Sequence, residues 1–201
     1  AQLAAELLAP PAGVSVLDAC AAPGGKAFNL LARDPSLKLT VLDRSEQRLG
    51  VVRREAMRLG HRVENVVLGD ATKTNWWNGR LFDAILLDAP CSGSGTLRRN
   101  PDIKIRRQPL HVVLAAQQQQ ALLNGVWPML STGGTLLYCT CSILPEENEQ
   151  VVNDFLESTP DAVTRDIRGR WGRPVDPGRL LLPSLGGSDG FYYALLKKIS
   201  P

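Results

Sequence analysis

The sequence predicts an α/β fold in which helices cover both faces of a mostly parallel central sheet. Three observations lead to this prediction. Short, continuously apolar runs alternate with segments of helical periodicity along most of the chain. Such unbroken apolar runs are typical of strands that are buried on both faces. Polar residues follow several of these runs directly, at the carboxyl edge where open α/β sheets bind their ligands.

The predicted strands are short apolar segments bounded by turn residues. The first follows an apolar helical stretch at 1–9 and a Pro-Pro-Ala-Gly turn, and it ends before a Pro-Gly-Gly turn. The fifth follows a Gly-Gly pair. The strands are expected at 14–20, 39–43, 66–68, 84–87, 135–140 and 191–196.

The predicted helices carry recognisable start and stop signals. Ser45 can cap a helix whose apolar residues recur every three or four positions until Gly60 ends it. Residues 110–130 have helical periodicity, and Gln117–Gln120 is expected on its solvated face. Pro145 suits the first turn of a last helix, where Glu146 and Glu147 would lie beside the positive end of the helix dipole. Residues 160–189 give no clear pattern.

Length and composition describe one globular domain. The chain has 201 residues, of which 44% are hydrophobic and 21% charged, and this composition argues against disorder. The net charge of +3 does not by itself indicate a nucleic-acid partner. No apolar run approaches the roughly 20 residues of a transmembrane helix, and no secretion signal opens the chain. We therefore expect a cytoplasmic protein without a membrane partner.

Four cysteines and two histidines, without a CxxC pair, argue against a zinc site and against a disulfide framework. We expect free thiols and no metal. Cys139, inside the fifth strand, is expected to be a small core side chain. Cys91 and Cys141 directly follow the fourth and fifth strands, which should be neighbours, so two thiols would face one crevice. The alternative is that these two cysteines are also core residues.

The turn after the first strand has the residue types of a phosphate loop without their spacing. Cys20 stands where the first glycine of such a loop is required, and Ala27 where Ser or Thr would bind magnesium. Asp43, at the end of the second strand, can accept both ribose hydroxyls. A nucleoside without a pyrophosphate fits best, and S-adenosylmethionine is the common one. The alternative is a simple tight turn, with Asp43 capping the next helix.

These segments resemble the Nop/Sun family of RNA cytosine-C5 methyltransferases, in particular its bacterial Sun-type members that act on small-subunit (16S) ribosomal RNA. The resemblance covers nearly the whole chain, in the family's order. Two departures are Ala27, in place of a small hydroxyl residue, and the missing N-terminal RNA-binding region of the family. The matching stretches are LDACAAPGGK (17–26), VLDRSEQRL (41–49), GD (69–70), LLDAPCSGSG (86–95), RRNPDIK (98–104), GGTLLYCTCSILPEEN (133–148) and DGFYYALLKK (189–198).

The resemblance implies a Rossmann-like class I S-adenosylmethionine-dependent methyltransferase, with 1–201 as a single catalytic domain that acts on RNA. We expect a monomer. It makes Cys141 the nucleophile and Cys91 the residue that helps to release the product. It assigns the cofactor pocket to Cys20, Ala21, Ala22, Pro23, Gly24, Gly25, Lys26, Asp43, Asp70 and Asp88.

The chemistry explains why such residues are needed. C5 of cytosine is a poor nucleophile until a thiolate adds to C6, and an ordinary cysteine titrates near ~8.5. Cys141 must therefore be activated, and neither histidine lies in a matching motif. Asp88 is expected to hydrogen-bond the cytosine edge and favour protonation at N3. Lys26 is expected to favour a nearby thiolate or carboxylate.

A basic segment follows the Cys91 loop. Residues 98–107 contain five cations and one anion. An RNA backbone would pass here, so we expect phosphate contacts, the alternative being a solvated loop. The expected RNA-binding residues are Arg98, Arg99, Lys104, Arg106 and Arg107.

Two other classes of function compete with RNA cytosine methylation. A non-catalytic RNA-binding or ribosome-assembly domain would not need the crevice cysteines. A methyltransferase for an amino nitrogen, suggested by the faint likeness of residues 88–91 to an Asp-Pro motif, would not need a thiolate. The presence of Cys91 and Cys141 therefore favours C5 methylation.

Overall fold

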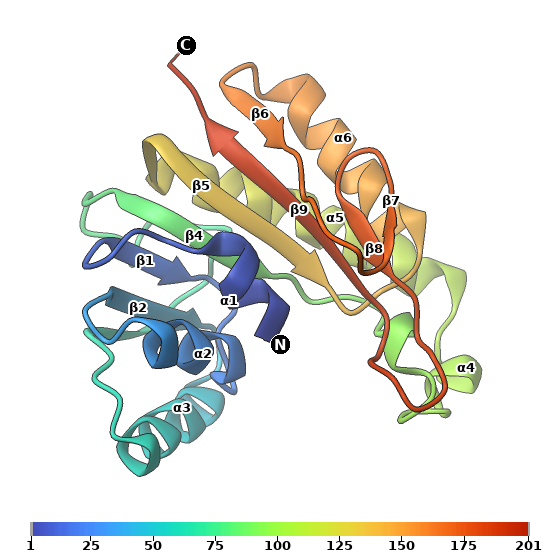
Figure 1. Ribbon diagram of the computed structural model, residues 1–201, viewed down its shortest axis with the longest axis horizontal. Helices are drawn as coiled ribbons and strands as arrows, with labels where there is room; N and C mark the ends of the chain where they lie inside the picture. Colours follow the sequence, from blue (N-terminus) through green and yellow to red (C-terminus); the bar gives the residue numbers. More distant parts are fainter. Residues whose placement is uncertain (1, 201) are drawn as a thin grey trace.

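In the computed structural model, which describes residues 2–200, a nine-stranded sheet lies between two layers of helices (Figure 1). The helices are α1 (Gln2–Leu8), α2 (Gly25–Arg33), α3 (Glu46–Leu59), α4 (Ile103–Arg106), α5 (Pro109–Val126) and α6 (Glu149–Ser158). The strands are β1 (Ser15–Asp18), β2 (Lys38–Asp43), β3 (Asn65–Leu68), β4 (Phe82–Asp88), β5 (Leu130–Thr140), β6 (Ala162–Arg165), β7 (Arg173–Pro174), β8 (Arg179–Leu181) and β9 (Phe191–Lys198).

The strand order is β3-β2-β1-β4-β5-β9-β8-β7, and β6 pairs with β9. The first five strands pair in parallel, whereas β9 runs antiparallel to β5. The predicted α/β fold with a mostly parallel sheet is confirmed. The chain builds outwards from β1 to β3 and then returns to place β4 on the other side of β1. The resulting switch point between β1 and β4 is where such sheets bind ligands.

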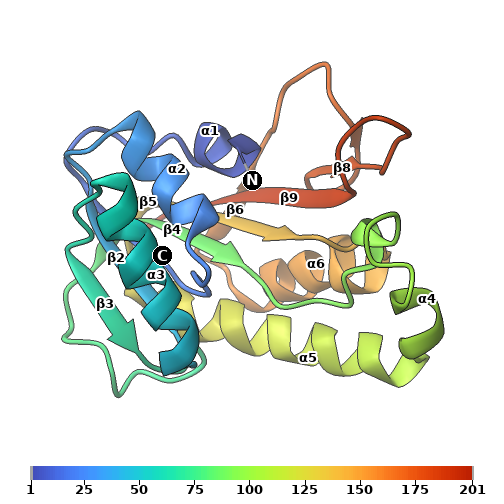
Figure 2. The same ribbon diagram turned by 90° about the horizontal axis from the view of Figure 1, so that it is seen from below.

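Two hydrophobic layers sandwich the sheet. Figure 2 shows α5 and α6 on one face and the first three helices on the other. Neighbouring residues of one strand enter opposite layers: Leu17 packs with the α5–α6 layer and Val16 with the α1–α3 layer. Both are fully buried, as are Ile85 and Leu86 on β4. Each fully buried aliphatic side chain stabilises the fold by about 1.5–3 kcal/mol, so the unbroken apolar runs hold both layers in place.

Local signals set the helix ends as the sequence predicts. The Ser45 hydroxyl accepts a hydrogen bond from the Arg48 amide at 3.3 Å, and α3 ends at Gly60 with a φ of 68°. Gly24, before α2, has a φ of 104°, and a Cβ there would lie 2.5 Å from the Phe28 ring. A glycine is therefore required at this turn. None of the helices described between residues 2 and 200 is long and apolar enough to cross a membrane.

Three local predictions are corrected. The fifth strand begins at Leu130 rather than at 135, because α5 ends at Val126 and a single 3₁₀ turn around Pro128 leads into the sheet. Pro145 opens a 3₁₀ turn, and the helix begins only at Glu149. Gln119 is fully buried and not solvated, since its amide donates to the carbonyl of Pro90 at 2.8 Å.

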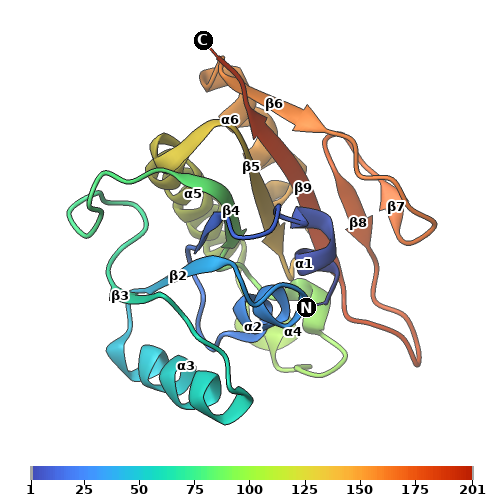
Figure 3. The same cartoon turned by 60° about the vertical axis from the view of Figure 1, so that its left-hand side comes forward.

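The segment that gave no clear pattern, 160–189, holds β6, β7 and β8. Figure 3 places β7 and β8 at the edge of the sheet beyond β9. These strands are only two to four residues long. β6 and β8 pair with β9, and β7 pairs with β8. This pairing depends on tertiary structure and leaves little periodicity in the sequence.

Candidate active site

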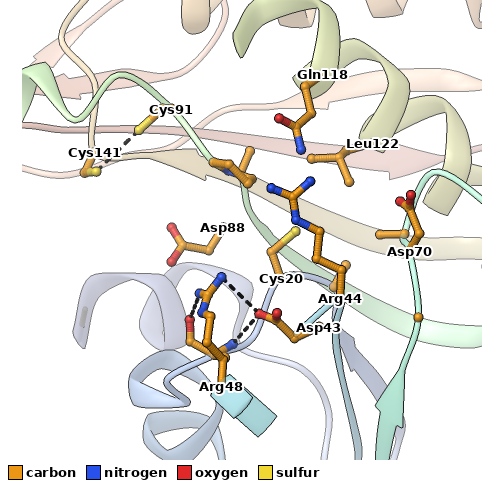
Figure 4. A pocket seen from close by; sticks show the side chains of 16 residues that line it. Cys20, Asp43, Arg44, Arg48, Asp70, Asp88, Cys91, Gln118, Leu122 and Cys141 are labelled. Atoms are coloured by element: carbon orange, nitrogen blue, oxygen red, sulfur yellow. Dashed lines mark hydrogen bonds and ion pairs between the residues drawn. The ribbon is translucent and has the colours of Figure 1, made fainter. Parts of the chain in front are cut away.

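A cavity of about 290 Å³ opens at the carboxyl edge of the five parallel strands, close to the lower end of small-molecule sites. Figure 4 shows the side chains that line it. The wall contains residues from the end of every parallel strand, as expected where these ends meet. The predicted site residues that line it are Cys20, Ala22, Asp43, Asp70, Asp88, Cys91 and Cys141.

The remaining predicted cofactor residues lie outside this wall. Ala21, Pro23, Gly24, Gly25 and Lys26 form the turn after β1 and the start of α2. Of these, Lys26 acts on the cavity indirectly, because it binds the lining residue Asp88.

Asp43 connects the turn after β1 to the start of α3. Its Oδ1 accepts the Ser45 amide at 3.0 Å, and its Oδ2 accepts the Ala22 amide at 3.3 Å. Arg48 lies 3.4 Å from Oδ2 and also donates to the carbonyl of Ala22. Asp43 therefore binds the chain that enters α3 and also lines the cavity, whereas the residue that caps α3 is Ser45. A carboxylate has about four acceptor positions, so it can accept a further donor.

Asp70 follows β3 at the opposite side of the cavity. Its Oδ1 accepts the amide and the hydroxyl of Thr72 at 2.9 and 2.8 Å, and these two bonds hold the pKa of Asp70 below its usual range. The Trp76 indole donates to the Asp70 carbonyl at 3.0 Å. A Cβ on Gly69 would lie 2.8 Å from the Trp76 ring. The Gly-Asp pair is thus held close against an aromatic side chain.

Several lining residues were not among the predicted site residues. Arg44 and Arg48 extend into the cavity from the turn after β2 and from α3 (Figure 4). Their closeness to Asp43 in the chain was a signal from which they could have been predicted. Gln118 and Leu122 come from α5. Their spacing of four places them on one helix face, but only the packing of α5 turns that face towards the cavity.

Charged groups cluster between the cofactor side and the thiols. Lys26 Nζ lies 2.5 Å from Asp88 Oδ2 and 5.5 Å from the centre of the Phe191 ring. Asp18 is only 1% exposed, and burial, followed by the negative charge of Asp88, raises the pKa of Asp18 to about 7. Because it lies so close, the Lys26 ammonium compensates the charge of Asp88, in agreement with the expectation that Lys26 favours a nearby carboxylate.

Two thiols lie side by side at the other end of the cavity. The Sγ atoms of Cys91 and Cys141 are 3.3 Å apart (Figure 4). The hydrogen bond from Cys91 lowers the pKa of Cys141 and raises that of Cys91. These directions favour Cys141 over Cys91 as the thiolate of the pair. Cys139 is buried in its strand, and burial raises the pKa of its thiol, in keeping with a core role.

The basic segment is partly tied to neighbouring loops. Arg107 donates to the carbonyl of Ser92 at 2.8 Å, next to Cys91. Arg98 donates to the carbonyl of Gly187 at 2.8 Å, and Arg99 pairs with Asp189. Two cations lie exposed on the short helix α4. They are Lys104 and Arg106.

The composition of the cavity wall fits S-adenosylmethionine. Asp43 and Asp70 supply carboxylate acceptors for hydroxyl and amino groups, and apolar surface comes from Ala71, Pro90 and Leu122. Between residues 2 and 200, no group of three or more His, Cys, Asp or Glu side chains is arranged to hold a metal ion.

Comparisons with known proteins agree with this geometry. The profile of a family described as "16S rRNA methyltransferase RsmB/F" matches residues 5–197. The chain is 47% identical over 199 residues to "Ribosomal RNA small subunit methyltransferase B" of Vibrio cholerae, covering 98% of this chain and 44% of that protein. The protein of the same name from Pseudomonas syringae pv. tomato is 47% identical over 207 residues, covering 100% and 46%. The chain thus spans less than half the length of these curated relatives.

Solved structures share the fold as well. NSun6 from Pyrococcus horikoshii, determined with the S-adenosylmethionine analogue SFG, has a TM-score of 0.90 at 28% identity, covering 100% of this chain and 52% of that one. A methyltransferase homologue from the same organism has a TM-score of 0.83 at 30% identity, covering 98% and 66%. The fold is therefore that of S-adenosylmethionine-dependent methyltransferases, as predicted.

Proposed function

Because this chain belongs to the RsmB/F family of 16S rRNA methyltransferases, we propose that it methylates C5 of a cytosine in RNA, with small-subunit ribosomal RNA as substrate and S-adenosylmethionine as methyl donor. The observation that carries this proposal is the thiol pair, 3.3 Å apart, at the edge of a nucleoside-sized cavity. Methyl transfer to an amino nitrogen would not require either thiol.

Cys141 is the nucleophile in this mechanism. Its thiolate forms a bond to C6 of the cytosine, and the electrons of the C5–C6 double bond move towards C5 and the N3 side of the ring. C5 becomes able to attack an electrophilic methyl group, which S-adenosylmethionine supplies when bound. The lowered pKa of Cys141 supports this role, because only the thiolate is reactive.

Release requires the reverse elimination. The C5 proton leaves to a base, the C5–C6 double bond re-forms, and the bond between C6 and the Cys141 sulfur breaks. Cys91, whose Sγ lies 3.3 Å from that of Cys141, is proposed to assist this step. Asp88 is proposed to hydrogen-bond the cytosine edge, and Lys26, at 2.5 Å, holds its carboxylate in place.

The RNA is proposed to pass over α4 and the loops beside it. The target base must leave its stack to reach the thiols, at a cost of a few kcal/mol unless it is already unpaired. The exposed cations Lys104 and Arg106 of α4 are proposed to bind the RNA phosphates. Within this proposal, residues 1–201 act as one catalytic domain in the cytoplasm.

The proposal is tested by incubating the protein with unmethylated small-subunit ribosomal RNA and methyl-labelled cofactor, followed by nucleoside mass spectrometry. We expect label in 5-methylcytosine and none in a reaction without protein. Label on an exocyclic nitrogen, or bound cofactor without any transfer, would contradict it.

The RNA path is tested through the salt dependence of RNA binding. The double variant Lys104→Ala and Arg106→Ala should lower the slope of log affinity against log salt by about 1.4, at ~0.7 for each phosphate that is no longer neutralised. Arg54→Ala is the control for loss of an exposed cation, because Arg54 lies on α3, outside the basic segment and outside the cavity wall. Equal slopes for the double variant and the unchanged protein would make α4 a solvated helix without a role in RNA binding.

A further inference from the structure

A buried carboxylate joins the two cysteine loops behind the thiols. Glu147 is expected from the sequence beside a helix dipole, but its side chain is 0% exposed. Its Oε1 accepts the Ser92 amide at 2.6 Å. Its Oε2 accepts the hydroxyls of Ser92 and Ser142, each at 2.5 Å. Three donors from two separate loops therefore converge on one side chain.

The hydroxyl protons in this cluster have defined directions. Each serine hydroxyl carries one proton, and those of Ser92 and Ser142 are given to Glu147. The Ser94 hydroxyl then donates to Ser142 Oγ at 2.9 Å, while its own oxygen accepts the Ile143 amide at 3.0 Å. A carboxylate, which only accepts, is the acceptor that completes this arrangement. We call Ser92, Ser94, Ser142 and Glu147 the serine–glutamate clasp.

The clasp is adjacent in the chain to both thiols. Ser92 directly follows Cys91, and Ser142 directly follows Cys141. The Gly95 amide also donates to the Cys141 carbonyl at 2.9 Å, and a Cβ on Gly95 would lie 2.8 Å from that oxygen. The two loops are therefore in close contact, and the bonds to Glu147 fix how they face each other.

The clasp is also anchored to β5. The Tyr138 hydroxyl donates to the Glu147 carbonyl at 2.7 Å. The Thr140 hydroxyl donates to Asn148 Oδ1 at 2.6 Å, and the Asn148 amide group donates to the Ser142 carbonyl at 3.1 Å. The 3₁₀ turn that carries Glu147 is thus held against the strand from which Cys141 emerges.

We propose that Glu147 is a positioning residue that sets the distance and orientation between Cys91 and Cys141. Glu147 does not line the cavity, so its effect passes through the two loops. The catalytic consequence rests on the proposed function: a loosened clasp should slow the release of methylated RNA from Cys141, because that step needs Cys91 beside it. Binding of the cofactor should not change.

The first test measures thiol geometry without any RNA. A diazenedicarboxamide oxidant takes up two protons and two electrons as Cys91 and Cys141 form a disulfide, and peptide mass spectrometry follows the cross-link. In Glu147→Gln the cross-linking rate should fall about tenfold, the effect of losing a charge-assisted hydrogen bond. Glu146→Gln, the exposed neighbour with the same charge change, is the control and should react like the unchanged protein.

Two milder substitutions test the same proposal in case Glu147→Gln does not fold. Ser142→Ala and Ser92→Ala each remove one donor and leave the carboxylate in place, so each should slow the cross-link less than Glu147→Gln. Melting curves establish that the variants are folded. A cross-linking rate that is unchanged in all three folded variants would overturn the proposal.

The second test measures turnover on RNA. In Glu147→Gln, kcat should fall, KM for the cofactor should stay constant, and a denaturant-resistant protein–RNA complex should accumulate. A kcat equal to that of Glu146→Gln, despite slowed cross-linking, would overturn the catalytic part of the inference. If the unchanged protein transfers no methyl group at all, the proposed function fails, while the cross-linking result still decides whether Glu147 positions the thiols.

Discussion

The two ends of the cavity are held together in different ways. At the cofactor end, Asp43 and Asp70 each accept a backbone amide from the residue two positions further along the chain. At the thiol end, the contacting residues are far apart in sequence: 50 positions separate Cys91 from Cys141, and 55 separate Ser92 from Glu147.

This difference implies that the cofactor end governs binding and the thiol end governs the reaction steps. Each carboxylate of the cofactor end accepts a local turn hydrogen bond, to which Asp43 adds the Ala22 amide from the turn after β1. At the thiol end, Cys91 and Cys141 are oriented only when β4, β5 and the turn before α6 are assembled. Substitutions at the cofactor end should therefore alter affinity for S-adenosylmethionine, whereas substitutions at the thiol end should alter the reaction steps.

The largest expected effect lies at the thiol end and distinguishes its two cysteines. Cys141→Ser should abolish methylation and form no stable adduct, because a serine hydroxyl is not ionised at neutral pH. Cys91→Ser should still attack C6 and methylate once, then remain bound to the RNA. A denaturing gel after incubation with RNA and cofactor measures the trapped complex.

The opposite pattern on that gel, with Cys141→Ser trapped and Cys91→Ser not, would exchange the two roles. Absence of a complex from both variants, with methylation intact in Cys141→Ser, would contradict covalent catalysis by Cys141. Full turnover by Cys91→Ser without a complex would remove Cys91 from product release.

An intermediate effect is expected at the cofactor end. Asp43→Ala removes a carboxylate that lines the cavity and should weaken cofactor binding by about 1.5–3 kcal/mol, the contribution of a hydrogen bond to a charged group. Isothermal calorimetry on the folded variant measures this loss. Asp34→Ala is a matched control, since Asp34 makes the same kind of turn, accepting the Ser36 amide at 2.8 Å, but does not line the cavity. Equal affinities for the two variants would remove Asp43 from the binding site.

The smallest effect is a shift in pH dependence at the thiol end. The hydrogen bond from Cys91 lowers the pKa of Cys141, so its thiolate forms at lower pH than that of an ordinary cysteine. Alkylation of Cys141 should rise with pH through this pKa, because the thiolate is the reactive form. Cys91→Ala removes the donor, so the midpoint should move to higher pH by about one unit, the equivalent of one hydrogen bond.

Peptide-resolved alkylation with iodoacetamide measures that midpoint. Cofactor affinity, measured in parallel, should be the same in both proteins. A midpoint that moves to lower pH, or does not move, would show that Cys91 does not activate Cys141.

Local sequence determined much of this molecule. The apolar runs predicted the parallel strands, and Ser45 and Gly60 bounded α3 as expected. Because the carboxyl ends of parallel strands share one edge, the positions of Asp43, Asp70, Asp88, Cys91 and Cys141 in the chain were enough to bring them to one cavity.

Tertiary structure alone decided the rest. Gln119 was expected in water but is buried against Pro90, and Glu147 was expected at a helix end but lies between two loops. The short strands β6 and β8 form because β9 provides a partner for each, and β8 in turn pairs with β7. In each case the stabilising partner lies many positions away in the chain. Hydrophobic periodicity and capping signals act within a few residues, whereas a buried polar group depends on the partner that folding brings to it.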